Sequence, residues 1–248
     1  MSRFAVLLRR ELAGYFAAPF VYVMSVFFLA FTGLGFWLLV ALRAPGPAGA
    51  DMVQEFFTSM SFWIALVGVV PLITMRLIAE EKRTGTIETL MTAPVSATQV
   101  VLAKYVAAFV FFAALWMPTL GYFLVLRMFN PHSMVLDAGR LASAYFGVLM
   151  VGTFLVAIGL FASSLTGSQA VAAMIAFSII CVFFLVGFLA SALGNALLKQ
   201  VAFYIASVQH MFDFAGGTVD SRPCVFYLSG CCVALVATVR FLDAGRAR

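Results

Sequence analysis

The amino-acid sequence predicts an all-α, polytopic membrane protein with about six transmembrane helices. Hydrophobic residues make up 64% of the 248 residues and charged residues only 10%, whereas soluble domains are nearer half apolar and a quarter charged. The apolar runs are continuous and about 20 residues or longer, unlike the short alternating segments of a transmembrane β-barrel. Because lipid offers no hydrogen-bond partners, the backbone groups of such runs bond to one another, which favours helices.

Residues 1–17 predict an amphipathic helix that lies in the membrane interface before the first span. Four apolar side chains fall on one face of this helix: Phe4, Leu8, Leu12 and Tyr15. The basic side chains of Arg3, Arg9 and Arg10 fall elsewhere. Two roles stay open for the helix, a membrane anchor and a contact with a soluble partner.

Intervals with few or no charges place six spans within a single transmembrane domain over residues 1–248. The predicted spans are residues 18–42, 57–78, 100–126, 141–163, 170–193 and 223–242. No charged residue occurs between Leu141 and Leu198, an interval long enough for two crossings. The polar residues 163–169 divide that interval into the fourth and fifth spans.

The segment 195–223 is too apolar for a free aqueous loop. We expect a pair of short helices there that re-enter the membrane before the last span. His210 and Asp213 are three residues apart and could share a helix face. Two ligands do not make a metal site, so hydrogen-bonded capping of helix ends is favoured over a metal pair.

The distribution of Lys and Arg predicts that both termini lie in the cytoplasm. With six spans, one side of the membrane holds most of the basic residues: Arg3, Arg9, Arg10, Arg76, Lys82, Arg83, Lys104, Arg240, Arg246 and Arg248. The other side holds Arg43, Arg127, Arg140, Lys199 and Arg222. The net charge of +5 is explained by this bias, and no basic stripe suited to nucleic acid occurs outside the membrane flanks.

A dense polar segment, residues 80–94, separates the second and third spans. It begins with four adjacent charges, Glu80 to Arg83, which would cost on the order of 10 kcal/mol in lipid on insertion scales. The segment therefore lies in water. A short, charged loop between two spans is suited to contact with a soluble partner.

The pattern from Glu80 to Ser96, EEKRTGTIETLMTAPVS, resembles the signature of ABC-2 type transporter permeases. Among these it is most similar to the gliding-motility type. The resemblance implies a short coupling helix, Thr86 to Met91, against a separate ATPase subunit. The implied ATPase-coupling residues are Glu80, Glu81, Lys82, Arg83, Gly85, Thr86, Ile87, Glu88, Leu90, Met91 and Pro94. The short loop Ser164 to Gln169, between the fourth and fifth spans, is expected to form a second cytoplasmic contact through Ser164, Thr166 and Gln169.

A second stretch, His210 to Arg222, resembles the polar patch that precedes the last span of these permeases. In the family this region forms re-entrant helices that cap the transport path. The resemblance therefore implies an outer gate formed by His210, Asp213, Phe214, Gly217 and Asp220.

Several kinds of chemistry are missing from the sequence. A P-loop lysine follows glycine, whereas Lys82, Lys104 and Lys199 follow Glu, Ala and Leu. We therefore expect no catalytic residue, metal or cofactor in this chain, with ATP and Mg²⁺ bound by the partner ATPase. The predicted span centres lack the ionisable groups of ion-coupled carriers, so the energy for movement is expected to come from outside the membrane.

Together the sequence and the resemblance predict the permease subunit of an ABC-2 transporter in the bacterial cytoplasmic (inner) membrane. Its expected partners are two ATPase copies, a second permease chain in a homodimer or heterodimer, the lipid bilayer and, in the gliding-type subgroup, an auxiliary membrane subunit. The alternative is a non-transporting scaffold that transmits the conformational changes of the ATPase to an envelope or gliding-machinery partner. The sequence names no substrate.

Overall fold

The computed structural model describes residues 3–43, 51–86, 96–129, 137–192 and 196–246, and every regular element within these ranges is a helix. The all-α prediction is confirmed. Six helical stretches are long and apolar enough to cross a membrane. They are Pro19–Leu42, Met60–Arg83, Ala97–Phe129, Ala138–Leu165, Gln169–Gly187 and Ser221–Ala244.

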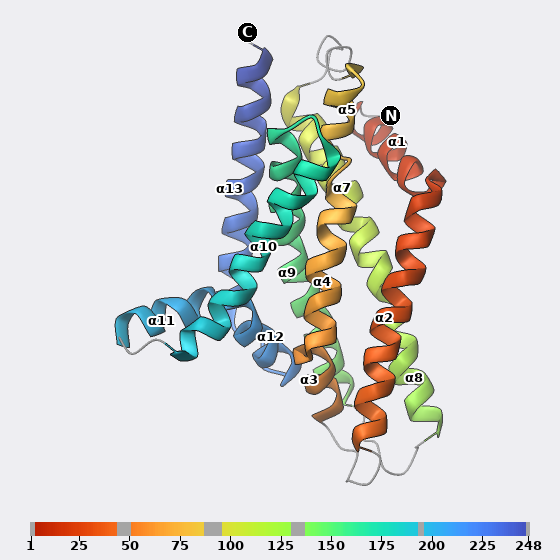
Figure 1. The fold of residues 1–248 in the computed structure, drawn as a ribbon, viewed down its shortest axis with the longest axis vertical. Coiled ribbons are helices and arrows are strands. Elements are labelled where there is room, and N and C mark those ends of the chain that lie inside the picture. The colour runs from red at the N-terminus through yellow and green to blue at the C-terminus, as the bar shows by residue number, and fades with distance from the viewer. Residues whose placement is uncertain (1–2, 44–50, 87–95, 130–136, 193–195, 247–248) are drawn as a thin grey trace.

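The first half of the chain carries the N-terminal helix and three of the candidate spans (Figure 1). Its elements are α1 (Arg3–Ala17), α2 (Pro19–Arg43), α3 (Asp51–Thr58), α4 (Met60–Thr74), α5 (Ala79–Arg83), α7 (Ala97–Trp116), the 3₁₀ turn η1 (Met117–Thr119) and α8 (Leu120–Phe129). Pro118 lies in η1, where the third span changes from α7 to α8. Proline lacks the N–H of a regular helical turn, so a change of helix there is expected.

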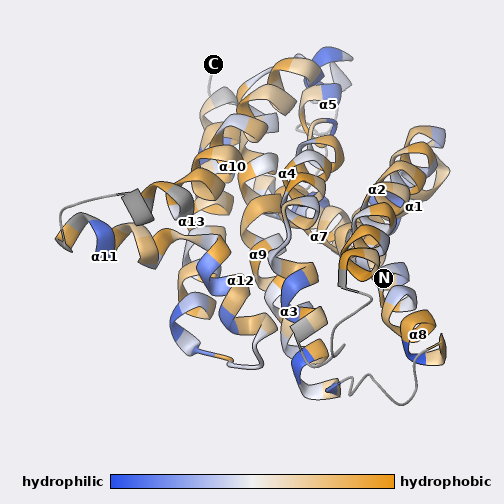
Figure 2. Cartoon of the chain, turned by 60° about the horizontal axis from the view of Figure 1, so that its bottom comes forward, coloured by the Kyte–Doolittle hydropathy of each residue, from blue (hydrophilic) through white to orange (hydrophobic). Residues whose placement is uncertain are grey.

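The second half contains the remaining spans and the two short helices expected before the last one. Its elements are α9 (Ala138–Leu165), α10 (Gln169–Ala192), α11 (Ala196–Ile205), α12 (Ser207–Ala215) and α13 (Ser221–Arg246). In Figures 1 and 2, α11 projects sideways from the bundle, whereas α12 lies against it.

The second span starts later than residue 57, the predicted start. Ser59 is extended, with φ −62° and ψ 151°, and its hydroxyl accepts a hydrogen bond from the Phe62 amide at 3.2 Å. A serine in this position is a strong helix start, so Met60 begins α4 and Phe57 belongs to α3. Hydropathy alone does not detect this break, because Phe57 is as apolar as the span that follows.

Helix α9 is the centre of the bundle and packs against α4, α7, α10, α12 and α13. Its glycines allow close approach within the chain. A Cβ atom at Gly152 would lie 2.2 Å from the Phe112 ring, and one at Gly159 would lie 2.2 Å from the Thr74 hydroxyl. The surface of α9 around Gly152 and Gly159 is therefore covered by α7 and α4.

The helices at the periphery are much less buried than α9. In the most apolar part of each of α2, α10 and α13, 22% of the residues are buried. In the corresponding part of α9, 78% of the residues are buried. Their exposed apolar side chains suit lipid or another membrane helix. Figure 2 shows hydrophilic residues mainly near the helix ends and on α3, α11 and α12.

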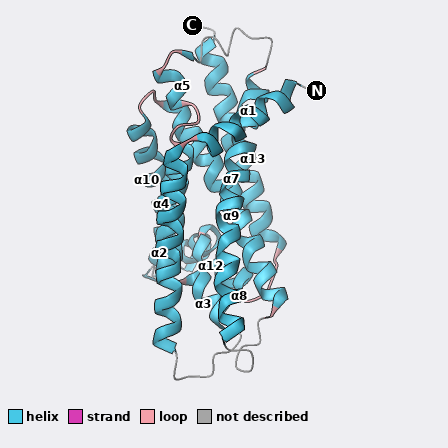
Figure 3. Cartoon of the chain, turned by 90° about the vertical axis from the view of Figure 1, so that its right-hand side faces the viewer, coloured by secondary structure: helices cyan, strands magenta, loops and turns pink. Residues whose placement is uncertain are grey.

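The bundle has two distinct ends. Helix α5 and both ends of the chain lie at one of them, and α3 and α12 lie towards the other (Figures 1 and 3). We refer to these as the α5 end and the α12 end. The two regions predicted from the sequence as sites are thus separated by the length of the spans.

Candidate functional site

The α5 end is built around a short helix whose start is capped by another span. The Ser163 hydroxyl of α9 accepts hydrogen bonds from the amides of Ile78, at 3.1 Å, and Ala79, at 3.0 Å. It also donates to the Met75 carbonyl at 3.2 Å. The first amides of a helix have no partner within the helix, so Ser163 satisfies two of them and fixes α5 on α9.

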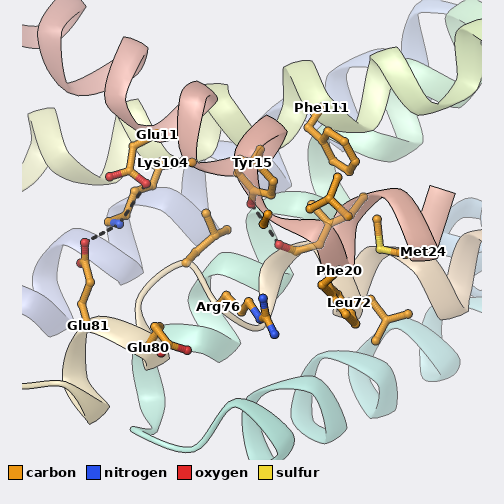
Figure 4. A pocket seen from close by; sticks show the side chains of 15 residues that line it. Glu11, Tyr15, Phe20, Met24, Leu72, Arg76, Glu80, Glu81, Lys104 and Phe111 are labelled. Atoms are coloured by element: carbon orange, nitrogen blue, oxygen red, sulfur yellow. Dashed lines mark hydrogen bonds and ion pairs between the residues drawn. The ribbon is translucent and has the colours of Figure 1, made fainter.

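Four charged side chains join α5 to α1 and α7, and we call them the ion cluster: Arg10, Glu11, Glu81 and Lys104. Lys104 is 2% exposed. Its ammonium group lies 2.7 Å from Glu81 and 3.3 Å from Glu11 (Figure 4). Arg10 adds contacts of 3.0 Å to Glu11 and 3.7 Å to Glu81. Pairing with two carboxylates offsets the cost of burying the lysine.

The exposed side of α5 continues into a turn. Glu80 and Arg83 form an ion pair at 2.7 Å on this side. The chain then turns at Gly85, whose φ of +71° lies in the left-handed region that glycine adopts readily. Thr84, Gly85 and Thr86 are exposed. The other predicted coupling residues, Ile87, Glu88, Leu90, Met91 and Pro94, lie outside the described residues.

The loop between α9 and α10 lies beside α5. The Lys82 ammonium donates to the Ser164 carbonyl and lies 4.9 Å from the centre of the Phe241 ring. An open groove runs between the two segments. Its lining residues are Arg76, Glu80, Arg83, Gly167, Ser168, Gln169 and Ala170. The two predicted cytoplasmic contacts thus share one surface.

The predicted residues of the second contact are not equally accessible. The Ser164 side chain is buried, and its hydroxyl donates to the Phe161 carbonyl at 2.6 Å, so it does not belong to this surface. The Thr166 hydroxyl accepts from the Ser168 amide at 3.1 Å and holds the loop. Gln169 lines the groove. Gly167 and Ser168, which lie within the predicted loop, are exposed.

A cleft of about 270 Å³ opens between α1, α2, α4 and α7, close to the ion cluster (Figure 4). Tyr15 forms part of its wall, stacking on Phe111 at 5.2 Å and donating to the Ile73 carbonyl at 2.9 Å. Burial raises the pKa of Tyr15, and Glu11 raises it further. The phenol is therefore a neutral donor that ties α1 to α4.

At the α12 end, the predicted gate residues lie on α12 and in the segment between α12 and α13. His210 is buried, and its Nδ1 lies 2.9 Å from the Tyr227 hydroxyl of α13. Burial lowers the pKa of His210, while Asp213 and Asp220 act in the opposite direction. His210 and Asp213 both lie on α12, but the hydrogen bond of His210 is made with Tyr227 of α13.

The remaining gate residues also have structural partners. Phe214 is buried against Gly147, where a Cβ atom would lie 2.8 Å from its ring. The Asp213 carbonyl accepts from the Thr218 amide and hydroxyl at 3.0 and 2.8 Å, closing α12. Gly217 follows with a φ of +91°. The Asp220 carboxylate accepts from the Arg222 amide at 3.0 Å and starts α13.

Sequence reasoning missed three of the links described above. Lys104 was predicted as a flanking cation, and its pairing with α1 depends on how two distant segments pack. Ser163 and Tyr227 were not predicted as partners, because their sequence separations from Ile78 and His210 leave no local pattern. Within the described residues, no cluster of three or more His, Cys, Asp or Glu side chains could hold a metal ion.

A comparison with known protein families finds a match over most of the chain. The model described as "ABC-2 family transporter protein" matches residues 46–229. The matched range extends from the segment before α3 into α13, and it includes α5, the α9–α10 loop and α12. No curated protein matches the chain.

Proposed function

Because this chain belongs to the ABC-2 family of transporter proteins and is a membrane subunit of an ABC transporter, we propose that its ATPase partner docks on the α5 end. The observation that carries this proposal is the shared surface of α5 and the α9–α10 loop. Both segments were predicted as contacts for a soluble partner, and a groove joins them. The exposed pair Glu80–Arg83 and the exposed turn 84–86 offer polar groups to such a partner.

The way α5 is anchored supports a coupling role. Ser163 and the Ser164 carbonyl bind it to α9, and Glu81 binds it to the buried Lys104 of α7. Lys104 in turn binds Glu11 of α1. A force applied to α5 by an ATPase would therefore reach three helices at once, while ATP and Mg²⁺ stay in the partner.

The proposed arrangement places the α5 end in the cytoplasm of a bacterial cell and the α12 end at the outer face of the inner membrane. The excess of Lys and Arg on the side of both termini supports this orientation. Two such chains would face each other above two ATPase copies, because symmetric pairs are the commonest arrangement of oligomers. The exposed faces of α2, α10 and α13 are available for lipid and for the second chain. The gliding-type subgroup stays a prediction.

The proposed gate at the α12 end is supported by geometry alone. Helix α12 is held to α13 by His210 and to α3 by the Gln54 amide, which donates to the Phe212 carbonyl at 3.3 Å. In this proposal, movement of the spans beneath α12 would change these contacts and shift the helix. The gate would then open or close the path at the outer face.

A co-purification experiment tests the docking proposal. The chain is co-expressed with an ABC ATPase subunit, and the purified complex is assayed for bound ATPase and for ATP hydrolysis. Reversing the charges of the exposed pair, Glu80→Lys with Arg83→Glu, is expected to lower ATPase retention about tenfold or more, since like charges across an interface cost several kcal/mol.

The matched control is Arg127→Glu, which reverses an exposed charge on α8 at the opposite end. Retention in this control is expected to equal that of the unchanged chain. Equal retention in the reversed pair as well, with undiminished ATP hydrolysis, would place the ATPase elsewhere and reject the proposal.

A further inference from the structure

We propose that the cleft between α1, α2, α4 and α7 binds one phospholipid from the adjacent membrane leaflet, with the lipid phosphate on Arg76 and the upper acyl chains on the apolar wall. Nothing in the proposed docking of an ATPase requires this site. The inference depends only on the chain lying in a bilayer, and it stands if the ATPase docks elsewhere.

The position of the cleft matches the level at which a phospholipid changes from polar to apolar. Helix α2 begins at Pro19, and the apolar part of α4 ends just before Arg76. Beyond Arg76 the chain carries the four charges that start at Glu80. The cleft thus spans the boundary between hydrocarbon and headgroup, where arginine and aromatic side chains are favoured.

Among the charged side chains that line the cleft, the ion pairs leave one cation available for an anionic group. Lys104 lies between Glu11 and Glu81, and Glu80 is paired with Arg83. Within the described part of the chain, no carboxylate lies within 4.0 Å of the Arg76 guanidinium. Arg76 is therefore the lining charge that a ligand can still neutralise.

The geometry of Arg76 favours phosphate. Its guanidinium carbon lies over the Phe20 ring, 4.6 Å from the ring centre. A guanidinium carries N–H donors in a fixed planar fork, and pairs of these donors match the paired oxygens of a phosphate. Figure 4 shows Arg76 beside Phe20 and Leu72, at the opening towards the apolar wall.

The apolar wall favours a lipid over a soluble anion. Phe20, Met24 and Leu72 line the cleft on the side away from the ion cluster. Leu72 is 37% exposed, so this wall is accessible from outside the bundle. The volume of about 270 Å³ accommodates a glycerophosphate group and the first part of the acyl chains, whose remainder stays in the bilayer.

Photo-crosslinking tests the proposal on the full chain reconstituted into vesicles of phosphatidylethanolamine and phosphatidylglycerol. A small fraction of the lipid carries a diazirine near the start of an acyl chain. Crosslinks are mapped by peptide mass spectrometry, and the yield on α2 and α4 is divided by the yield on α13, whose exposed apolar face reports ordinary surrounding lipid.

Two substitutions at the cleft are compared with one control. Arg76→Gln removes the cation and is expected to lower the yield ratio about tenfold, as for a lost charge-assisted hydrogen bond. Gly14→Leu is expected to lower it similarly, because Gly14 lines the cleft and a Cβ there meets no atom within 4 Å. Arg127→Gln, on exposed α8, is expected to leave the ratio unchanged.

Three results would overturn the inference. An unchanged ratio in both cleft variants would show that no lipid is held there. A loss with Arg76→Gln but not with Gly14→Leu would place the phosphate in the groove beside the α9–α10 loop. Displacement of the crosslinks by excess inorganic phosphate would identify a soluble-anion site.

Discussion

At the scale of single residues, Lys104 is the side chain whose role changes most between sequence and structure. In the sequence it is one cation near the end of an apolar run. In the structure it is buried and shared by two carboxylates from different segments. Its importance follows from the packing of α1 on α7, which no local pattern encodes.

Lys104→Met is expected to destabilise the chain by about 2–4 kcal/mol, because it leaves Glu11 and Glu81 without their shared buried partner. The measurement is the free energy of unfolding in detergent micelles. Arg83→Gln serves as the control, since the Arg83 side chain is 60% exposed and its pair is worth about 0–1 kcal/mol. Equal losses in the two variants would contradict a structural role for the ion cluster.

Ser163→Ala is expected to cost about 1–3 kcal/mol, because the buried amides of Ile78 and Ala79 lose their acceptor. Ser178→Ala is the matched control, since that exposed hydroxyl bonds only to the Met174 carbonyl of its own helix. Thermal unfolding of both variants gives the comparison. A small effect in Ser163→Ala would mean that α5 does not depend on α9 for its start.

His210 is expected to make the stability of the α12 end depend on pH. Its folded pKa is lowered by burial, so the stability it confers is present above the unfolded pKa of about 6.5. That stability is lost as pH falls through the folded pKa. Unfolding midpoints measured across this range should fall on acidification, and the His210→Gln variant should show a smaller fall. Identical pH profiles would remove His210 as the cause.

At the scale of elements, helix α9 depends on its glycines for packing. Gly152→Ala is expected to destabilise by about 1–3 kcal/mol, because its Cβ would overlap the Phe112 ring. Gly121→Ala on α8 is the control, since a Cβ there meets nothing within 4 Å. Unfolding of the two variants in the same detergent checks this. Tolerance of alanine at Gly152 would show that α7 can move away from α9.

The same scale shows what the sequence could and could not predict. Apolar length predicted six spans, and the apolar composition of 195–223 predicted the short helices α11 and α12. The start of α4 was missed because it depends on the backbone of Ser59. The burial of Ser164 was missed because a polar residue near a loop is expected to be exposed. In the structure its hydroxyl donates a hydrogen bond to the Phe161 carbonyl of the same helix.

At the scale of the whole molecule, the separation of the α5 end from the α12 end is the feature that a topology experiment can test. Cysteines are placed at Ser168 and Thr218 in a variant whose native cysteines are replaced. In intact cells, a membrane-impermeant maleimide is expected to label Thr218→Cys and not Ser168→Cys, since the basic residues favour a cytoplasmic α5 end. Labelling of Ser168→Cys from outside would exclude an ATPase at that end.

The structure also sets the limits of prediction at this scale. Charge distribution along the chain predicted which segments share a side, and the structure places α5 and the chain ends together. The groove between α5 and the α9–α10 loop could not be read from the sequence, because it depends on how two spans end beside each other.

The attachment of α1 has a practical consequence for protein engineering. Glu11 and Tyr15 bind Lys104 and the Ile73 carbonyl, so α1 is packed as part of the membrane domain. Trimming it to improve expression would remove one of the two carboxylates that pair with the buried Lys104 and would uncover the ring of Phe111. A shortened protein that keeps the spans is expected to aggregate, even though every hydrophobic segment is still present.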